Sequence, residues 1–383
     1  MMQPVHIKEV ILHHTTVSLI APFTTSFGTM TDKDVCLVEV IDESGVSGWG
    51  ETVTSNEPYY NEETTATAVY MLKEFFIPRL LKQEFSHPNV VHDMLSFVRR
   101  NNIAKASIET AIWDVFAKKN HTSIAELLGG TQTEIPVGKS IGIQDTPALL
   151  VEKVRTFVDE GFKKIKVKIK PGADLEYLNA VRKAFPDIPL MADANSAYTL
   201  DDIDHLKKLD ALNLMMIEQP LSHDDIVDHR ILQQELTTPV CLDESVHSLD
   251  DARKAIELGS CQIINIKIGR VGGLYESKRI HDLCLEKGIA VWCGGMLETG
   301  IGRAHNIQLT TLKNFTIPGD TAPSAHYWKE DIVTPEIVMD HGIIHVPSGD
   351  GIGYEVDREK LGKVLISSER ITEADTTHPI PSA

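Results

Sequence analysis

From about residue 135 onward, short apolar runs alternate with segments whose apolar residues recur at helical spacing. The runs are apolar on both faces, which is typical of parallel strands covered by helices. Seven runs are clear and an eighth is weaker; they cover residues 135–143, 163–169, 189–195, 212–220, 239–245, 261–268, 288–295 and 315–320. This count predicts a (β/α)8 barrel over residues 131–340. A doubly wound open sheet is the alternative, but no glycine-rich dinucleotide turn follows the first run.

The first 130 residues follow a different pattern. Residues 5–21 and 35–42 are rich in β-branched and apolar residues, which predicts a small antiparallel sheet. Residues 62–83 and 104–128 carry apolar positions at helical spacing. The chain is therefore expected to be an α/β protein with an α+β N-terminal capping domain, residues 1–130, in front of the barrel.

The C-terminal part carries shorter signals. Residues 341–357 read as short strands and turns, and we expect residues 341–370 to complete the capping domain. Residues 371–383 are polar and contain proline, which predicts a disordered tail.

Composition narrows the possible partners and location. The chain has 37 Lys and Arg against 55 Asp and Glu, a net charge of −18, which argues against binding to nucleic acid or to an anionic membrane. We find neither a signal peptide nor an apolar stretch long enough to span a membrane. Five scattered cysteines indicate reduced thiols and a cytoplasmic location.

Charged residues recur at the ends of five consecutive apolar runs. Lys168, Asp193, Glu218, Asp243 and Lys267 are 25, 25, 25 and 24 residues apart, close to one strand–helix unit each time. They should therefore lie at the same height, at the C-terminal mouth where barrel enzymes build their active sites. A structural ion-pair network is the alternative, but the strict register and the sign order favour a functional site.

These residue types suit one kind of chemistry. Three converging carboxylates without a thiol or a histidine indicate a hard divalent cation, Mg²⁺, for which Mn²⁺ or another divalent ion could substitute. Lys168 and Lys267, four strands apart, should face each other across the mouth, and Lys166 points the same way as Lys168. A cation stabilises the charge that develops when a proton α to a carboxylate leaves, and a lysine near a cation has a lowered pKa and can act as the base. The same site could racemise a substrate or dehydrate it.

Ten motifs spread over almost the whole chain resemble the enolase superfamily. Within it, the match is closest to the muconate-lactonising subgroup and its o-succinylbenzoate synthase / N-succinylamino acid racemase family. The motifs are APFTTSFGT (21–29), GWGE (48–51), SIGI (140–143), KVKIKPG (166–172), DANSAYTL (193–200), IEQPL (217–221), CLDES (241–245), INIKIGRVGG (264–273), VWCGGMLETGIGRA (291–304) and PGDT (318–321).

The resemblance implies roles for the five mouth residues. Asp193, Glu218 and Asp243 would be the metal ligands. Lys168 and Lys267 would be the acid/base groups on opposite faces of the substrate. In the dehydration, Lys168 would perform both proton transfers while Lys267 stabilises the intermediate.

The resemblance also implies residues that hold the substrate. They are Phe23 and Phe27 in a loop that closes over it, and Ser140, Gly294, Gly295 and Met296 around its succinyl or amide portion. Lys166 and Asn195, on the same strand faces as Lys168 and Asp193, complete the predicted substrate-binding set. Arg270 would tune Lys267, although Ile268 stands where the family commonly has proline.

The function implied is Mg²⁺-dependent abstraction of a proton α to a carboxylate from a small succinyl or N-acyl carboxylate. That activity is o-succinylbenzoate synthesis in the menaquinone pathway, racemisation of N-succinyl or other N-acyl amino acids, or both, by a homo-oligomer. The alternatives are a dipeptide epimerase or cycloisomerase of the same subgroup, a phosphate-binding barrel enzyme built on the glycines of 294–302, and a non-catalytic metal-stabilised binding barrel. We interpret His223 as a solvated loop residue and Cys293 as a packing residue.

Overall fold

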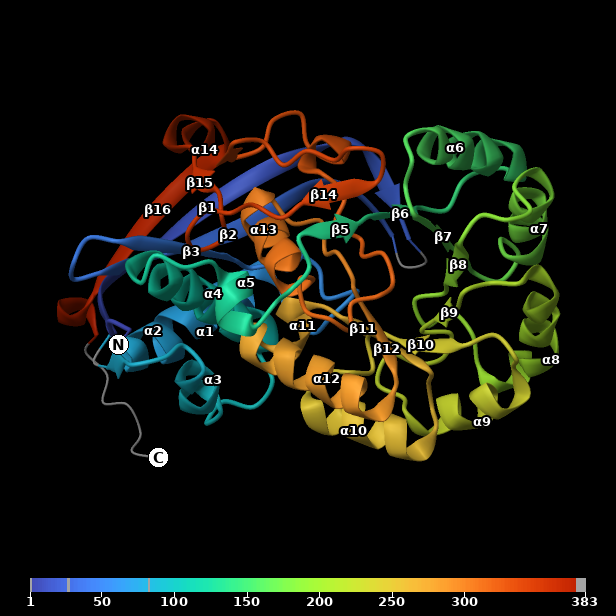
Figure 1. The fold of residues 1–383 in the computed structure, drawn as a ribbon, viewed down its shortest axis with the longest axis horizontal. Coiled ribbons are helices and arrows are strands. Elements are labelled where there is room, and N and C mark those ends of the chain that lie inside the picture. Colours follow the sequence, from blue (N-terminus) through green and yellow to red (C-terminus); the bar gives the residue numbers. More distant parts are fainter. Residues whose placement is uncertain (1, 26–27, 82, 377–383) are drawn as a thin grey trace.

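The computed structural model describes residues 2–25, 28–81 and 83–376, and Figure 1 shows its two parts. One part is an antiparallel sheet with helices, and the other is a curled parallel sheet surrounded by helices. This arrangement confirms the predicted α/β barrel with an N-terminal α+β domain.

The N-terminal domain is built on a sheet with the strand order β16-β1-β2-β3, in which β4 also pairs with β1. Its strands are β1 (Val5–Thr24), β2 (Thr29–Asp42), β3 (Ser47–Glu51), β4 (Glu84–Phe85) and, from the far end of the chain, β16 (Leu365–Thr372). Its helices are α1 (Thr65–Met71), α2 (Ile77–Leu80), α3 (Val90–Leu95), α4 (Asn102–Lys119) and α5 (Ile124–Leu128).

Both helices predicted in this domain are interrupted. A π-helical turn (Leu72–Phe76) separates α1 from α2, and Pro78, which cannot donate a backbone hydrogen bond, lies in the first turn of α2. The second predicted helix is α4 followed by α5, which begins at its own capping residue, Ser123.

Helix α4 is buried around almost its whole circumference because it lies between β3 and the short barrel helix α11 (Ile268–Val271). The approach of β3 to α4 is so close that a Cβ at Gly50 would lie 1.9 Å from the Ser107 carbonyl oxygen. Helix α4 therefore joins the two domains across a packed interface.

Within the described residues, the barrel sheet has seven parallel strands in sequential order. They are β6 (Gly138–Ile141), β7 (Lys164–Lys168), β8 (Leu190–Asp193), β9 (Ile217–Glu218), β10 (Val240–Leu242), β11 (Ile263–Ile266) and β12 (Ala290–Cys293). The helices around them are α6 (Pro147–Asp159), α7 (Leu175–Ala184), α8 (Ile203–Leu206), α9 (Val227–Glu235), α10 (Leu249–Leu258), α11, α12 (Leu274–Lys287) and α13 (Gly300–Leu309). The weak eighth run lies between the first and last strands, where Phe315 bridges to Val291 and Gly319 bridges to Val137.

The C-terminal segment contacts the N-terminal domain before its last strand, since Gly351 exchanges backbone hydrogen bonds with Thr122 and Ile124. β14 (Ile343–His345) pairs with β5 (Glu134–Pro136), and β13 (Val333–Thr334) pairs with β15 (Glu355–Val356). After α14 (Arg358–Val364), β16 joins the N-terminal sheet beside β1, as Figure 1 shows. Strand β16 continues through Thr372, past the predicted start of the tail at residue 371, and residues 377–383 lie outside the described residues.

Two further sequence expectations concern cysteines and membranes. All five cysteines are buried free thiols. Among the described residues, no helix is both long enough and apolar enough to cross a membrane.

Candidate active site

The five charged residues singled out by their spacing come together at one end of the barrel. Lys168 pairs in register with Asp193, and Asp193 pairs with Glu218, on the adjacent strands β7, β8 and β9. Asp243 follows β10, and Lys267 follows β11 as the capping position of α11. All five side chains are buried.

Around Lys168, the site is a network of buried ion pairs. The Lys168 Nζ atom lies 2.5 Å from Asp193 Oδ2 and donates to Asn195 Oδ1 at 2.6 Å. Lys166 Nζ lies 3.3 Å from an oxygen of both Asp193 and Glu218 and 2.6 Å from Asp320 Oδ2. Lys166 therefore connects two mouth carboxylates to the eighth run.

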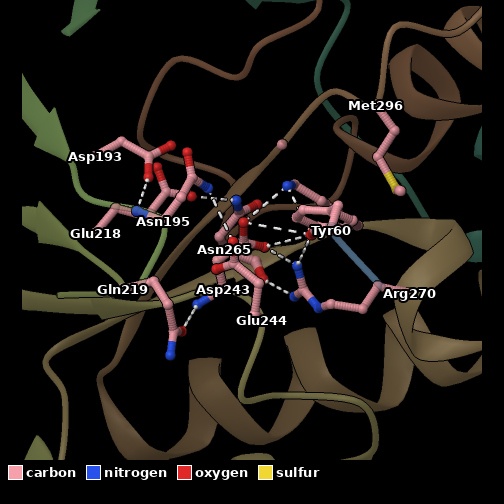
Figure 2. Close-up of polar contacts among 12 residues, drawn as sticks. Tyr60, Asp193, Asn195, Glu218, Gln219, Asp243, Glu244, Asn265, Arg270 and Met296 are labelled. Atoms are coloured by element: carbon pink, nitrogen blue, oxygen red, sulfur yellow. Dashed lines mark hydrogen bonds and ion pairs between the residues drawn. The ribbon is translucent and has the colours of Figure 1, made fainter. Parts of the chain in front are cut away.

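Around Lys267, a second group of contacts converges on Asp243. Figure 2 shows Tyr60 and Arg270 beside Asp243. Lys267 Nζ donates to Asp243 Oδ2 at 2.7 Å and to the Tyr60 hydroxyl at 2.8 Å, and that hydroxyl donates to Asp243 Oδ1 at 3.2 Å. Arg270 also pairs with Asp243, so Ile268 in place of proline does not keep the Arg270 guanidinium away from the site.

Polar side chains between the two groups link them. Asn265 donates to Glu218 Oε1 at 2.7 Å, and Asn195 donates to Glu244 Oε1 at 2.8 Å. Together with Lys164, which lies 3.4 Å from Asp320 Oδ1, the ionisable residues form one connected set that we call the mouth cluster. Its members are Lys164, Lys166, Lys168, Asp193, Glu218, Asp243, Glu244, Lys267, Arg270 and Asp320.

The mouth cluster shifts the pKa values of its members in opposite directions. Burial and the adjacent Asp193 carboxylate raise the pKa of Glu218. Burial opposes ionisation of Asp193 as well, but Lys168 and Lys166 outweigh it and lower the pKa of that carboxyl group. Burial would also lower the pKa of Lys267, yet Tyr60, Glu244 and Glu218 together raise it. Without a bound cation, acidic neighbours therefore hold the pKa of Lys267 above its usual value. The lowered pKa expected for a lysine beside a cation stays a prediction.

A cavity of about 460 Å³ lies over the mouth cluster, between the two domains. Lys168, Lys267 and Asn195 lie on its barrel side, and its other wall consists of β2 and residues 53–61. Of the residues predicted to hold substrate, Phe23, Gly295 and Met296 also line this cavity.

The other predicted substrate residues lie outside the cavity wall or outside the described residues. Ser140 pairs in register with Lys166 one strand away, and its buried hydroxyl oxygen makes no hydrogen bond to a described residue. Gly294 packs against Lys267, where an added Cβ would lie 2.6 Å from the lysine Cε. Phe27 falls outside the described residues.

The structure disfavours a phosphate site on the glycines of 294–302, a nucleophilic Cys293 and a catalytic His223. A Cβ at Gly300 or Gly302 would contact Asp331 or Glu298 and Glu51, so this segment is packed against carboxylates rather than open to a phosphate. Burial raises the pKa of the Cys293 thiol, which disfavours the reactive thiolate. His223 is exposed and lies outside the cavity wall.

Several site residues were missed by sequence reasoning. Lys164 and Asn265 share a strand face with Lys166 and Lys267, and their two-residue spacing could have revealed them. Tyr60 reaches the barrel from the N-terminal domain, and no pattern within residues 52–64 signals that contact.

A divalent cation suits the chemistry of this site. Asp193, Glu218 and Asp243 supply buried carboxylate oxygens from neighbouring strand ends, the donor type that Mg²⁺ prefers. As placed, no three His, Cys, Asp or Glu side chains of the described residues form a group able to hold an ion. Ion pairs with Lys168, Lys267 and Arg270 occupy the carboxylates, so side-chain rotation would have to precede binding.

The barrel, its mouth cluster and the N-terminal domain above them define an enolase-type enzyme. Residues 149–360 match the family model "Enolase C-terminal domain-like", and residues 7–129 match "Mandelate racemase / muconate lactonizing enzyme, N-terminal domain". The chain belongs to the mandelate racemase / muconate lactonizing enzyme family of the enolase superfamily.

Individual relatives cover nearly the whole chain. An o-succinylbenzoate synthase from Geobacillus kaustophilus is 57% identical over 93% of this chain and 95% of its own. An N-succinylamino acid racemase from Thermus thermophilus is 47% identical over 90% of this chain and 93% of its own. A solved member of the enolase superfamily from Listeria innocua is 42% identical, with a TM-score of 0.94 over 96% of this chain and 100% of its own.

Proposed function

We propose that this enzyme removes a proton α to a carboxylate from a dianionic succinyl-bearing substrate, as an o-succinylbenzoate synthase, an N-succinylamino acid racemase, or both. The observation that carries the proposal is that Lys168, the last residue of β7, and Lys267, directly after β11, both line one cavity. A base and an acid on opposite sides of a bound α-carbon can take a proton from one face and return it to the other.

The proposal assigns a Mg²⁺ ion to Asp193, Glu218 and Asp243. An ion held by these carboxylates would supply positive charge to stabilise negative charge on the substrate carboxylate. Lys168 and Lys267 hold or move the proton at their Nζ atoms. Lys166 remains paired with Asp320 beside the strand end that carries Lys168.

Charge balance supports a dianionic substrate. The ten members of the mouth cluster are five cations and five carboxylates, so the fully ionised set has no net charge. A divalent cation would leave an excess of two positive charges in a buried site, which is unfavourable unless it is compensated. Within the mouth cluster, a substrate with two carboxylates offsets these two charges, whereas a zwitterionic dipeptide offsets neither.

The choice of succinyl compounds rests on the relatives. Proteins 57% and 47% identical to this chain are an o-succinylbenzoate synthase and an N-succinylamino acid racemase. In dehydration, one lysine would perform both proton transfers, and in racemisation each lysine would act on one face. We further propose that the enzyme is a cytoplasmic homo-oligomer that acts in menaquinone synthesis, as its sequence and its resemblance to the family imply.

One preparation of enzyme with Mg²⁺ should be assayed for both reactions. Polarimetry follows racemisation of N-succinyl amino acids, and ultraviolet absorbance follows formation of o-succinylbenzoate from its cyclohexadiene precursor. We expect at least one activity, absent in Lys168→Ala, and faster turnover of N-succinyl substrates than of a zwitterionic dipeptide. A correctly folded wild-type enzyme without either activity would refute the proposal.

A further inference from the structure

The segment that follows β12 forms part of the cavity wall but is held from the other domain. Gly295, Met296 and Leu297 line the cavity. Lys33, on β2 of the N-terminal domain and only 3% exposed, donates from Nζ to the carbonyl oxygens of Met296 at 2.6 Å and Leu297 at 3.1 Å. A buried ammonium group thus holds two consecutive carbonyl groups of this wall.

The far end of the same segment is held by a carboxylate. Glu51, at the end of β3 and buried, accepts hydrogen bonds from the Thr299 backbone N–H at 3.0 Å and the Thr299 hydroxyl at 2.7 Å. It also accepts from the Gly302 N–H at 3.0 Å, at the start of α13. Lys33 and Glu51 together hold residues 296–302 at both ends, and we call this pair the wall clamp.

The segment itself needs such support. Leu297 has a φ of 55°, in the left-handed region, which costs conformational free energy for any residue other than glycine. The Met296 N–H donates to Glu298 Oε1 at 2.8 Å, which tightens the turn but does not attach it to the other domain. The wall clamp therefore supplies contacts that fix the turn against β2 and β3.

The partners of Lys33 argue against a merely structural ion pair. Among the described residues, no carboxylate oxygen lies within 4 Å of its Nζ, although Glu51 and Glu298 are near enough to interact with its charge. Burying an ammonium group is costly, and here its donors are directed to backbone carbonyls of the cavity wall.

We infer that Lys33, assisted by Glu51, is a positioning residue that determines where Gly295–Leu297 stand and therefore which acyl groups the cavity accepts. This inference rests on the proposed function for the identity of the substrate. Lys33 also lines the cavity itself, but its Nζ is directed to the Met296 and Leu297 carbonyl groups, so we infer that it acts through the backbone of the wall and takes no part in proton transfer. Removing its ammonium group should change the preference of the enzyme among acyl groups more than it changes the rate of proton transfer.

The first test compares Lys33→Met with a matched control, Lys119→Met. Lys119 is a mostly buried lysine of the same domain whose Nζ lies 3.0 Å from Asp42 and which lies outside the cavity wall. The measured quantity is the ratio of kcat/KM for an N-succinyl amino acid to that for its N-acetyl analogue. We expect Lys33→Met to change the ratio about tenfold, mainly through KM, and Lys119→Met to change it less than about twofold. An unchanged ratio in Lys33→Met, or equal changes in both variants, would overturn the inference.

A second test needs no substrate. Hydrogen–deuterium exchange of the amides in residues 296–302 should be about tenfold faster in Lys33→Met than in wild type, and unchanged in Lys119→Met. Glu51→Gln, which keeps one carbonyl acceptor, should accelerate amide exchange at Thr299 and Gly302. This variant replaces Lys33→Met as the test if Lys33→Met does not fold. Equal protection in wild type and both clamp variants would refute the wall clamp. A wild-type enzyme inactive on every acyl substrate would instead refute the proposed function.

Discussion

The buried carboxylate of Asp320 links the eighth run to β7 of the barrel. Removing its charge should lower the stability of the protein by an amount that the structure allows us to calculate. This residue of the eighth run is only 5% exposed, and its carboxylate lies 2.6 Å from Lys166 Nζ and 3.4 Å from Lys164 Nζ. Its backbone N–H donates to Cys293 O at 2.9 Å, which ties the run to β12. Asp320→Asn keeps the size of the side chain and removes only its charge.

The expected cost follows from what the two lysines retain. Lys166 keeps Asp193 and Glu218 as partners, whereas Lys164 keeps the face of Trp292, 3.6 Å from its Nζ. Removing one partner of a buried ion pair typically costs about 3–5 kcal/mol. Because Lys166 remains paired, we expect about 3 kcal/mol, almost all of it from Lys164.

Urea unfolding of wild type, Asp320→Asn, Lys164→Met and the double variant measures this cost and the coupling. The double variant should be more stable than Asp320→Asn, since it no longer contains the unpaired Lys164. A loss below about 1 kcal/mol in Asp320→Asn, or additive effects in the cycle, would refute the reasoning.

The difference in unfolding free energy between wild type and Asp320→Asn should also depend on pH, in a direction that the structure determines. Burial opposes ionisation of Asp320, but Lys166 and Lys164 outweigh it and hold its pKa well below the usual range. Its contribution is therefore present above the ordinary Asp pKa of about 3.9 and is lost as the pH falls below it. The stability gap between wild type and Asp320→Asn should persist down to about pH 4 and shrink below.

Three further predictions concern the lysines, the metal and a buried glutamate. Lys168→Ala and Lys267→Ala should each abolish racemisation but retain α-proton exchange with one enantiomer, a different one for each variant, as NMR of the two pure enantiomers will show. Chelation with EDTA should abolish activity with little change in thermal unfolding, because lysines and Arg270 already pair with the mouth carboxylates. Burial raises the pKa of Glu109 to about 7, so its proton-linked stabilisation is present below the ordinary Glu pKa of about 4.3 and is lost as the pH rises through 7. The difference in unfolding free energy between wild type and Glu109→Gln should accordingly narrow between pH 5 and pH 8.

Each of these predictions has a contradicting outcome. Loss of exchange with both enantiomers in both lysine variants would rule out two independent bases. Unfolding on chelation would mean that the carboxylates need the cation for stability. A gap between wild type and Glu109→Gln that stays constant or widens towards pH 8 would show that burial does not raise this pKa.

The sequence predicts the barrel well because its strands are buried on both faces and regularly spaced. The same regular spacing predicts that five residues lie together at one end of the sheet, as the structure shows. They are Lys168, Asp193, Glu218, Asp243 and Lys267. The eighth run forms only single bridges, since its sequence, FTIPGD, contains a proline and a glycine that weaken a strand.

What the sequence could not predict comes from contacts between the domains. Tyr60 and Lys33 reach the barrel from loops and strands whose local patterns carry no trace of that contact. The direction of the Lys267 pKa was also beyond sequence reasoning, because it depends on Tyr60 and on the close approach of Glu244 and Glu218. Local periodicity predicts helices and strands, whereas contacts between the domains and the pKa of Lys267 depend on tertiary packing.

The central claim is abstraction of a proton α to a carboxylate between Lys168 and Lys267. Proton NMR of N-succinyl amino acids in D₂O with enzyme and Mg²⁺ tests it most directly. The account predicts loss of the α-proton signal that depends on the metal and is absent in the Lys168→Ala, Lys267→Ala double variant. Retention of the α-proton with every N-succinyl substrate and with the o-succinylbenzoate precursor, in a folded and metal-loaded enzyme, would contradict it.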